Sequence, residues 1–477
     1  MYVSYKFTYH PVTVADCCDV GRRVTIDMLP DVALLEIFDC YVEEARGGGS
    51  LKIQKWHTLV YVCRQWRAIV LGSPRRLDLR LLCTAKTPVK ETLAVWPPLP
   101  IVIRQYGYTA QMDNIIVVLE HNERICQIDL NVTKSQLEQV LPAMQHPFPA
   151  LTKLVIAGEM HPVVPESFLG GSAPRLQYLY LERIPFPGLP NLLLTATDLV
   201  SLYVWNIPHS GYISPEAMVR CLFTLTRLET LSLGFESPKS RPVQERRHPH
   251  PPTRSTLLAL TYFEFEGVSE YLEDFMARID APLLDNLSIT FFHQLIFDTP
   301  QIAQFFARTP NIQSLVEAHI VFYDDCVVVK SPQTLPRGFE LRVSCKQSDW
   351  QLSSMAQVCS SSFPQVLIRM VEHLHISEFK YGRPRWQDDI EGSQWVEALH
   401  PFVALKDLHI SREILPRMAP AFQELAGERV TEVLPALQSI FLEEPHPSGP
   451  VREAMDKFVA ARHLASHPIT VSLGQDM

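Results

Sequence analysis

Apolar residues recur along this chain with two different spacings, one near the N-terminus and the other through most of the remainder. The first is the spacing of a helix face, with apolar residues three and four positions apart. It is carried by Leu34, Ile37, Phe38 and Tyr41, then by Trp56, Leu59, Val60 and Cys63, and then by Trp66, Ile69 and Val70. The pattern predicts three short helices, with glycines at 47–49 ending the first and Gly72-Ser73-Pro74 ending the last.

Three helices of this length cannot enclose all of their own apolar side chains, so another surface has to cover some of them. One prediction is that a partner protein provides this cover. The alternative is that the helices pack onto the rest of the same chain. The periodicity alone does not separate the two.

The second spacing is the repeated unit Leu-x-x-Leu-x-Leu, found throughout the chain after residue 74. Clear copies centre on Leu154, Leu179, Leu202, Leu231, Leu287, Leu374, Leu408 and Ile440, and weaker ones start at Ile125, Leu260 and Ile312. Successive centres at 154, 179 and 202 are 25 and 23 residues apart. One short strand cannot bury itself, so we expect the copies to stack into a parallel sheet on the concave face of a curved solenoid.

The segments between these strands carry helix start signals. Ser214, Ser269 and Thr299 each stand before an amphipathic stretch as candidate caps, and proline follows two of them. Strands that alternate with helices predict an α/β fold. The alternating residues Leu77, Leu79 and Leu81 are expected to begin the sheet, and Ile469, Val471 and Leu473 to end it after a helix near Met455 and Phe458.

Three segments lack this regularity. Residues 1–25 show no sustained period and are interpreted as a loose leader. Residues 236–255 contain five prolines and several arginines without an apolar pattern, which predicts a mobile surface loop. The pattern does not position strands in residues 330–365.

Composition narrows the possible functions. A hydrophobic content of 47% with 20% charged residues is typical of a soluble globular protein. The net charge of −9 argues against a primary role on nucleic acid or an anionic membrane. The ten cysteines form no Cys-x-x-Cys pair, which indicates reduced thiols in the cytoplasm or nucleus. The sequence has no apolar run of the ~20 residues that span a bilayer.

The sequence predicts no catalytic residue, metal site or cofactor. The glycines at 47–49 lack the lysine of a phosphate-binding loop. His248 and His250, and likewise His373 and His375, have metal-like local spacing without a neighbouring cysteine or carboxylate ligand, and are interpreted as solvated or satisfied histidines. The pairs Asp324-Asp325 and Asp388-Asp389 are interpreted as loop carboxylates, and Cys63 as a packing residue. An enzyme assembled from scattered His, Cys and Asp residues stays open as a third class.

Binding is the better supported role. In a strand whose leucines point inward, the alternate residues face the concave surface. Those positions hold Tyr178, Tyr180, Tyr203, Trp205 and Tyr262, followed by His373, His375 and His409. Large amphipathic rings are frequent in contact hot spots, so the five aromatic residues are predicted to contact a protein substrate. The alternative is that a neighbouring loop or the C-terminal segment covers them.

The first block resembles an F-box. The resemblance is carried by Leu29, Pro30, Leu34, Leu35, Ile37, Phe38, Leu59, Val62, Cys63, Arg64, Trp66 and Arg67. Val32 and Ala33 replace the usual acidic residue and leucine, and about ten residues are inserted around the glycines, a length that surface loops tolerate. The continuation from Gly72 to Pro100 looks like F-box proteins of mushroom-forming fungi, and the repeats resemble an irregular leucine-rich repeat solenoid.

The resemblance implies an F-box at 26–73 and a leucine-rich repeat solenoid at 74–477. F-box proteins dock on a Skp-family adaptor, and through it on a cullin ligase of the SCF type, while their repeats recruit a substrate for ubiquitination. The adaptor contact would fall on Leu29, Pro30, Leu34, Ile37, Phe38 and Val62, with Trp66 and Arg67 shaping or bordering it, and the alternative for Trp66 is a place inside the helical block. Such a chain catalyses nothing itself. The rival interpretation is an interaction scaffold outside the ligase.

Overall fold

The computed structural model describes residues 26–43, 56–107, 111–159, 162–240, 254–292, 299–312, 315–332, 338–345, 348–362, 368–379, 386, 391–427, 429–444 and 449–473. The chain divides into two compact units, Met1–Leu81 and Leu82–Met477. This division falls later than the boundary predicted after residue 73. The predicted leader at 1–25, the glycines at 47–49 and most of the predicted loop, 241–253, lie outside the described residues.

The first unit contains the three predicted helices. They are α1 (Asp31–Glu43), α2 (Trp56–Val60) and α3 (Arg64–Gly72), preceded by the short 3₁₀ turn η1 (Ile26–Met28). The buried face of α1 is Leu34, Phe38 and Val42, at helical spacing of four. Cys63 caps α3, since its Sγ accepts a hydrogen bond from the Trp66 backbone N–H at 3.4 Å.

Residues 73–80 belong to the helical unit and not to the sheet. Leu77 and Leu79 are buried, but this stretch is a series of turns and the first strand begins only at Leu81. The Trp56 indole N–H donates to the Arg80 carbonyl at 3.0 Å, which ties the stretch to α2. The prediction of a strand from Leu77 onward was therefore wrong, because the chain turns here and the Trp56 hydrogen bond fastens it to α2 before the strand begins at Leu81.

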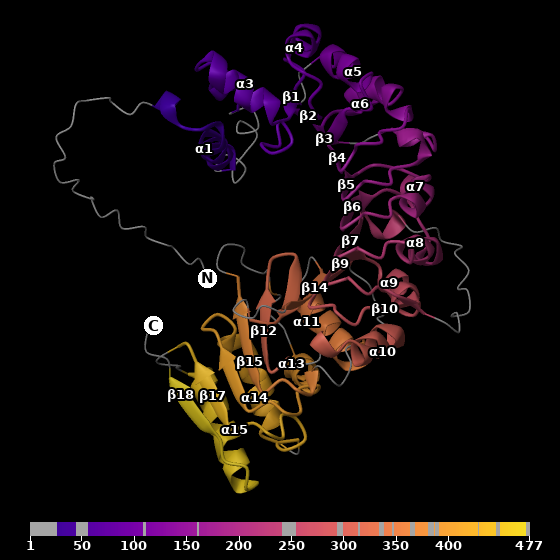
Figure 1. The fold of residues 1–477 in the computed structure, drawn as a ribbon. Coiled ribbons are helices and arrows are strands. Elements are labelled where there is room, and N and C mark those ends of the chain that lie inside the picture. The colour runs from indigo at the N-terminus through magenta and orange to yellow at the C-terminus, as the bar shows by residue number, and fades with distance from the viewer. Residues whose placement is uncertain are drawn as a thin grey trace, which may run out of the picture. The chain divides into compact units, whose positions relative to one another are not determined.

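One long mixed sheet organises the second unit (Figure 1). Its described strands are β1 (Leu81–Cys83), β2 (Ile101–Tyr106), β3 (Ile125–Asn131), β4 (Lys153–Ala157), β5 (Tyr178–Glu182), β6 (Ser201–Ile207), β7 (Thr230–Phe235), β9 (Tyr262–Gly267), β11 (Asn286–Phe291), β12 (Glu317–Phe322), β13 (Cys326–Lys330), β14 (Gly338–Ser344), β15 (His373–Glu378), β16 (Asp407–Ile410), β17 (Ser439–Leu442) and β18 (Thr470–Leu473). From β2 to β11 each strand pairs in parallel with the next one in the sheet.

Helices connect the strands and lie along one face of the sheet (Figure 1). They are α4 (Val89–Val95), α5 (Asp113–Leu119), α6 (Lys134–Val140), α7 (Leu189–Thr195), α8 (Pro215–Leu222), α9 (Ser269–Met276), α10 (Pro300–Arg308), α11 (Ser348–Gln357), α13 (Gly392–Leu399), α14 (Leu415–Leu425) and α15 (Pro450–Leu464). The repeated strand and helix form the predicted α/β solenoid. The leucines of the repeat, such as Leu179 and Leu181 on β5, are buried under the helices, while the residues between them are partly exposed.

Three helix starts test the predicted caps. Ser214 caps α8 by accepting from the Ala217 N–H at 3.3 Å, as predicted. Ser269 is not a cap, because the helix already includes it and Val268 holds the cap position. At α10, Thr299 makes no capping bond, and Glu273 of α9 accepts from the backbone N–H groups of Gln301 and Ile302 at 2.9 and 2.7 Å.

The sheet is not parallel throughout, which corrects the predicted fold. After β11 the chain places β12 three positions further along the sheet, and β13 and β14 turn back to fill the two positions between them. The strand β13 is antiparallel to both β12 and β14, while β14 is parallel to β11 and β12 is parallel to β15. The weak copy at Ile312 forms a 3₁₀ turn, and the strand starts later, at Glu317.

The edges of the predicted loop and the predicted end of the solenoid are described. Residues 238–240 form a 3₁₀ turn, and β8 (Ser255–Thr256) pairs in parallel with β10 (Ile279–Asp280). At the C-terminal end α15 precedes β18, which pairs in parallel with β17, as the final apolar alternation predicted. Among the helices described, none has the length and apolar character needed to cross a bilayer.

Candidate functional site

Two of the residues predicted to contact an adaptor lie in the core of the helical unit. Leu34 and Phe38 are both 0% exposed, and the Phe38 ring packs against Trp66 with 4.7 Å between ring centres. Side chains buried in this way hold the helices together and offer no surface to a partner. The prediction that these two residues contact an adaptor directly does not fit their burial.

The other predicted contact residues are accessible to different degrees. Ile37 is 45% exposed and Val62 is 58% exposed, and Pro30 is also exposed, while Leu29 and Trp66 are half-buried. Arg67 is exposed, but its Nε donates to the Val60 carbonyl at 2.9 Å, so part of its role is to join α3 to the end of α2.

Apolar exposure is concentrated in this unit. Among the residues that the structure describes, six of the twenty exposed large hydrophobic side chains lie in 26–62: Ile26, Met28, Val32, Ile37, Tyr61 and Val62. We call these six the apolar set. Val32 is one of the two departures from the F-box pattern, and at 64% exposed it adds apolar area where an acidic residue was expected. Exposed apolar side chains on one small unit are candidates for contact with another surface.

On the second unit, strand register aligns one residue of each strand of the long sheet, from β2 to β18, into a continuous row. The Cα atom of each member is paired in register with that of the next, from β2 to β18, and the antiparallel strands continue the row. This central row is Arg104, Asp129, Val155, Tyr180, Tyr203, Ser232, Glu264, Ser288, Glu340, Lys330, His319, His375, His409, Phe441 and Ser472. It joins the predicted aromatic positions of the first half to the histidines of the second.

Three of the predicted substrate residues form an aromatic cluster around the row. The Tyr203 ring lies 5.4 Å from that of Tyr178 and 6.0 Å from that of Tyr180, between ring centres. The Tyr180 hydroxyl donates to Glu182 at 3.0 Å. Burial, together with this hydrogen bond, raises the pKa of Tyr180 to about 12, so its phenol stays neutral. The cluster is half-buried and held by its neighbours.

Trp205 lies flat against the neighbouring strand because that strand offers a glycine. A Cβ atom on Gly234 would come within 2.4 Å of the Trp205 ring. The indole of Trp205 therefore occupies the space that a side chain at position 234 would need. The sequence prediction placed Trp205 on the sheet surface and could not foresee this lateral packing.

Tyr262 borders a hollow in the sheet surface of about 330 Å³. The hollow lies where the parallel strands meet the antiparallel segment, and Glu264, Ser288, Lys330 and Glu340 of the central row line it. The Tyr262 hydroxyl donates to Glu264 at 3.1 Å, and burial, with Glu264 beside it, raises the pKa of Tyr262 to about 12. The hollow thus combines acidic groups with neutral hydroxyl donors.

Three histidines and Phe441 form a stack of rings across four strands of the second half. The ring centres of His319 and His375, of His375 and His409, and of His409 and Phe441 are 4.6, 4.1 and 4.3 Å apart, and successive rings are within 15° of parallel. His373 lies in the adjacent row, where its Nδ1 pairs with the Asp407 carboxylate at 2.8 Å. In-register parallel strands produce such stacks whenever aromatic rings occupy the same row.

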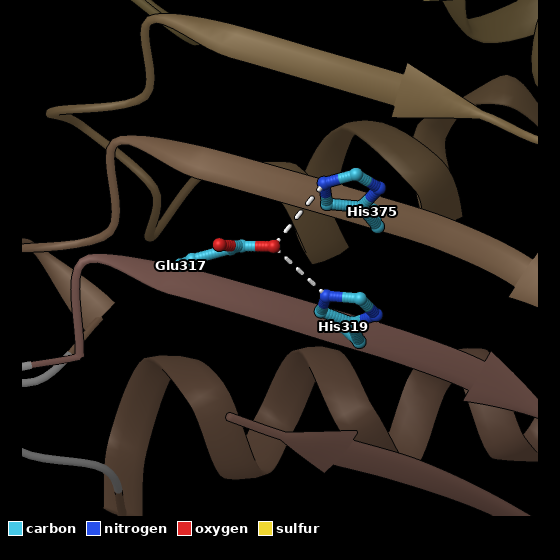
Figure 2. A group of neighbouring side chains, drawn as sticks. All are labelled: Glu317, His319 and His375. Atoms are coloured by element: carbon cyan, nitrogen blue, oxygen red, sulfur yellow. Dashed lines mark hydrogen bonds and ion pairs between the residues drawn. The ribbon is translucent and has the colours of Figure 1, made fainter. Parts of the chain in front are cut away.

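Glu317 brings a carboxylate to this stack (Figure 2). Its Oε1 lies 3.1 Å from His319 Nε2 and 3.5 Å from His375 Nε2. Burial, with His409 and His319 adding to it, lowers the pKa of His375 to about 4, although Glu317 acts in the opposite direction. The sequence pattern singled out His375 but not Glu317 or His319, because no local spacing relates β12 to β15.

Four of the described cysteines have thiols that burial holds in the protonated form. Burial raises the pKa of Cys83 and of Cys221 to about 11, and of Cys326 and of Cys359 to about 12, which keeps these thiols protonated at neutral pH. Cys63 caps a helix, where it was predicted to pack. What the described surface offers is side chains arranged for contact.

Comparison with known proteins adds little to this picture. The chain matches no protein-family model, and no curated protein matches its sequence. Among solved structures, it is similar to the leucine-rich repeat-containing protein LegL7 from Legionella pneumophila, at 13% sequence identity and a TM-score of 0.28. That match covers 70% of this chain and 90% of the Legionella protein. The solenoid architecture therefore rests on the hydrogen-bonded strands of the chain itself.

Proposed function

We propose that this chain is the substrate-recognition subunit of an SCF-type ubiquitin ligase. The helical unit docks a Skp-family adaptor and thereby a cullin ligase, and the sheet surface of the second unit binds a protein substrate. The chain itself catalyses nothing in this role. It holds substrate lysines near a ubiquitin-loaded enzyme, which raises their effective concentration there. Such a complex works in the cytoplasm or the nucleus.

The observation that carries the proposal is the apolar set on a unit with the helix order of an F-box. When a partner covers apolar side chains that lie outside the small helical core, their removal from water stabilises the complex by roughly 25 cal/mol per Å² of apolar area. Ile37 and Val62 belong to this set and also to the residues of the F-box resemblance. The contact is therefore assigned to them and to Pro30, while Leu34 and Phe38 support the contact from within.

Substrate binding is assigned to the aromatic cluster and the neighbouring hollow. Tyr178, Tyr180 and Tyr203 form a partly exposed group of rings, and Tyr262 lines the hollow together with Glu264 and Glu340. Half-buried tyrosines lose little side-chain entropy on binding because their neighbours already hold them, which favours a contact site.

Co-purification with a fungal Skp-family adaptor tests the proposal. The double variant Ile37→Asp, Val62→Asp should lose the adaptor, since two carboxylates cannot be buried in an apolar contact without large cost. Because both positions are exposed, the circular dichroism spectrum should stay unchanged. The matched control is Phe223→Asp, Leu258→Asp, at two positions of the second unit that are 63% and 65% exposed.

The control should retain the adaptor, and retention by the Ile37 and Val62 variant would exclude the proposed contact. In the same experiment Tyr180→Ala, Tyr203→Ala should keep the adaptor and lose captured proteins. The burial of Leu34 and Phe38 within their own unit favours the alternative of a scaffold outside the ligase. That alternative predicts no adaptor with the native chain, and captured proteins that still depend on Tyr180 and Tyr203.

A further inference from the structure

We propose that Glu317, His319 and His375 form a binding site for a zinc-class divalent transition metal ion on the sheet surface. This site is separate from the adaptor contact and does not depend on the ligase proposal. The three residues lie on two adjacent strands, β12 and β15, whose register pairs Glu317 with His373 and His319 with His375. Figure 2 shows the carboxylate directed at both imidazoles.

The donor set is the first argument. Two imidazole nitrogens and one carboxylate oxygen are the ligand types that Zn²⁺ takes at sites with an open position. Among the described residues, these three ligand atoms lie within 4.8 Å of one another.

The distances are the second argument. A tetrahedral ion with bonds of about 2.0–2.1 Å separates its ligand atoms by about 3.3 Å. The Glu317 oxygen lies 3.1 Å from one histidine nitrogen and 3.5 Å from the other. Zn²⁺ has no geometric preference from its d electrons, so it accepts ligand directions that the strand register sets.

Binding changes the histidine stack. The rings of His319 and His375 are inclined by only 15°, so each has to turn about its Cβ–Cγ bond before both Nε2 lone pairs meet one ion. The backbone need not move, because adjacent strands already hold the Cα atoms about 4.8 Å apart. The fourth position of the ion remains open to water or to a side chain of a bound protein.

Zinc titration of the full chain by isothermal calorimetry tests the site. We expect one Zn²⁺ bound with an affinity that Glu317→Gln and His375→Ala each lower by at least about tenfold, since even partners that only orient ligands contribute that much. Co²⁺ in place of Zn²⁺ should give the visible absorption of a tetrahedral site, and both variants should lose it. Zn²⁺ should also raise the melting temperature of the native chain and not that of Glu317→Gln.

The matched control is His373→Ala, a histidine on the same strand that pairs with Asp407 in the adjacent row. It should retain the affinity and the Co²⁺ spectrum. Thermal unfolding without metal verifies that all variants fold. The assignment is overturned if the native chain and Glu317→Gln bind Zn²⁺ equally, if neither binds it, or if His373→Ala removes binding as completely as His375→Ala.

Discussion

Several partly buried side chains on this sheet are stabilised by contacts with neighbouring residues. Trp205 occupies the space left at Gly234, and Tyr180 is held by Glu182 and Tyr203. At Glu266 the neighbouring residues do not fully offset the free-energy cost of a partly buried charged carboxylate. Burial raises the pKa of Glu266, Glu264 adds to the rise, and the Arg342 guanidinium only partly opposes it.

The pH dependence of stability should reveal this cost. The pKa of Glu266 is higher in the folded than in the unfolded state, so between the two values the folded state binds more protons and stability falls as pH rises. Glu266→Gln removes the ionisation. It should raise the free energy of unfolding at pH 7, by less than about 1 kcal/mol because solvent screens the group.

Urea unfolding of both proteins from pH 7 down to pH 3 measures the effect. The advantage of Glu266→Gln should shrink as the pH falls through the raised pKa of the folded state, and it should be lost below about 4.5, where the native carboxyl becomes protonated in the unfolded state as well. A difference that is constant over this range would show that the charge of Glu266 is not its source.

At the scale of elements, the sequence predicted those parts whose packing follows from local spacing. The strands centred on Leu179, Leu202 and Leu231 were placed correctly because their leucines alternate with polar positions. The face of α1 was predicted too broadly. Residues along a helix are about 100° apart, so Ile37 points well away from Phe38 although both are apolar.

Non-local pairing accounts for what the sequence could not show. The apolar run Val327 to Val329 fits a buried strand, but nothing in it indicates an antiparallel position between β12 and β14. Glu317 meets His375 only because β12 and β15 are neighbours in the sheet. The cap of α10 likewise comes from Glu273 on the preceding helix, in place of the expected Thr299.

Removal of this cap should be measurable. Glu273→Ala leaves the N–H groups of Gln301 and Ile302 without their acceptors at the buried start of α10. The free energy of unfolding should fall by about 1–3 kcal/mol in urea titrations. Glu216→Ala is the control, because Glu216 lies in the first turn of α8 and forms an exposed pair with Arg220 worth about 0.3–0.5 kcal/mol. Equal losses in the two variants would argue against the capping role.

At the scale of the whole molecule, the two compact units have separate cores. The helical unit buries Leu34, Phe38 and Trp56, whereas the second unit buries one row of leucines after another along its sheet. In a solenoid each repeat contacts mainly its neighbours, so stability accumulates along the stack. Separate cores would allow one chain to carry the proposed adaptor contact and the proposed substrate contact without shared residues.

Calorimetry should resolve the two units as two transitions. Leu34→Ala and Leu287→Ala each remove a fully buried leucine side chain, at a cost of about 2–5 kcal/mol. Leu34→Ala should lower the midpoint of one transition, and Leu287→Ala that of the other. A single transition that both substitutions shift would mean that the chain unfolds as one cooperative unit.

The central row has a consequence for the length of ligand that this surface can bind. Each strand contributes one position, so the fifteen strands from β2 to β18 give a graduated scale of roughly 67 Å at 4.8 Å per step. The antiparallel segment does not interrupt this scale, since β12, β13 and β14 each supply one residue position, as the other strands do. Loss or gain of a single strand and its helix would shorten or lengthen the scale by one step. Evolution can therefore retune the distance between the tyrosines and the histidines without redesigning either group.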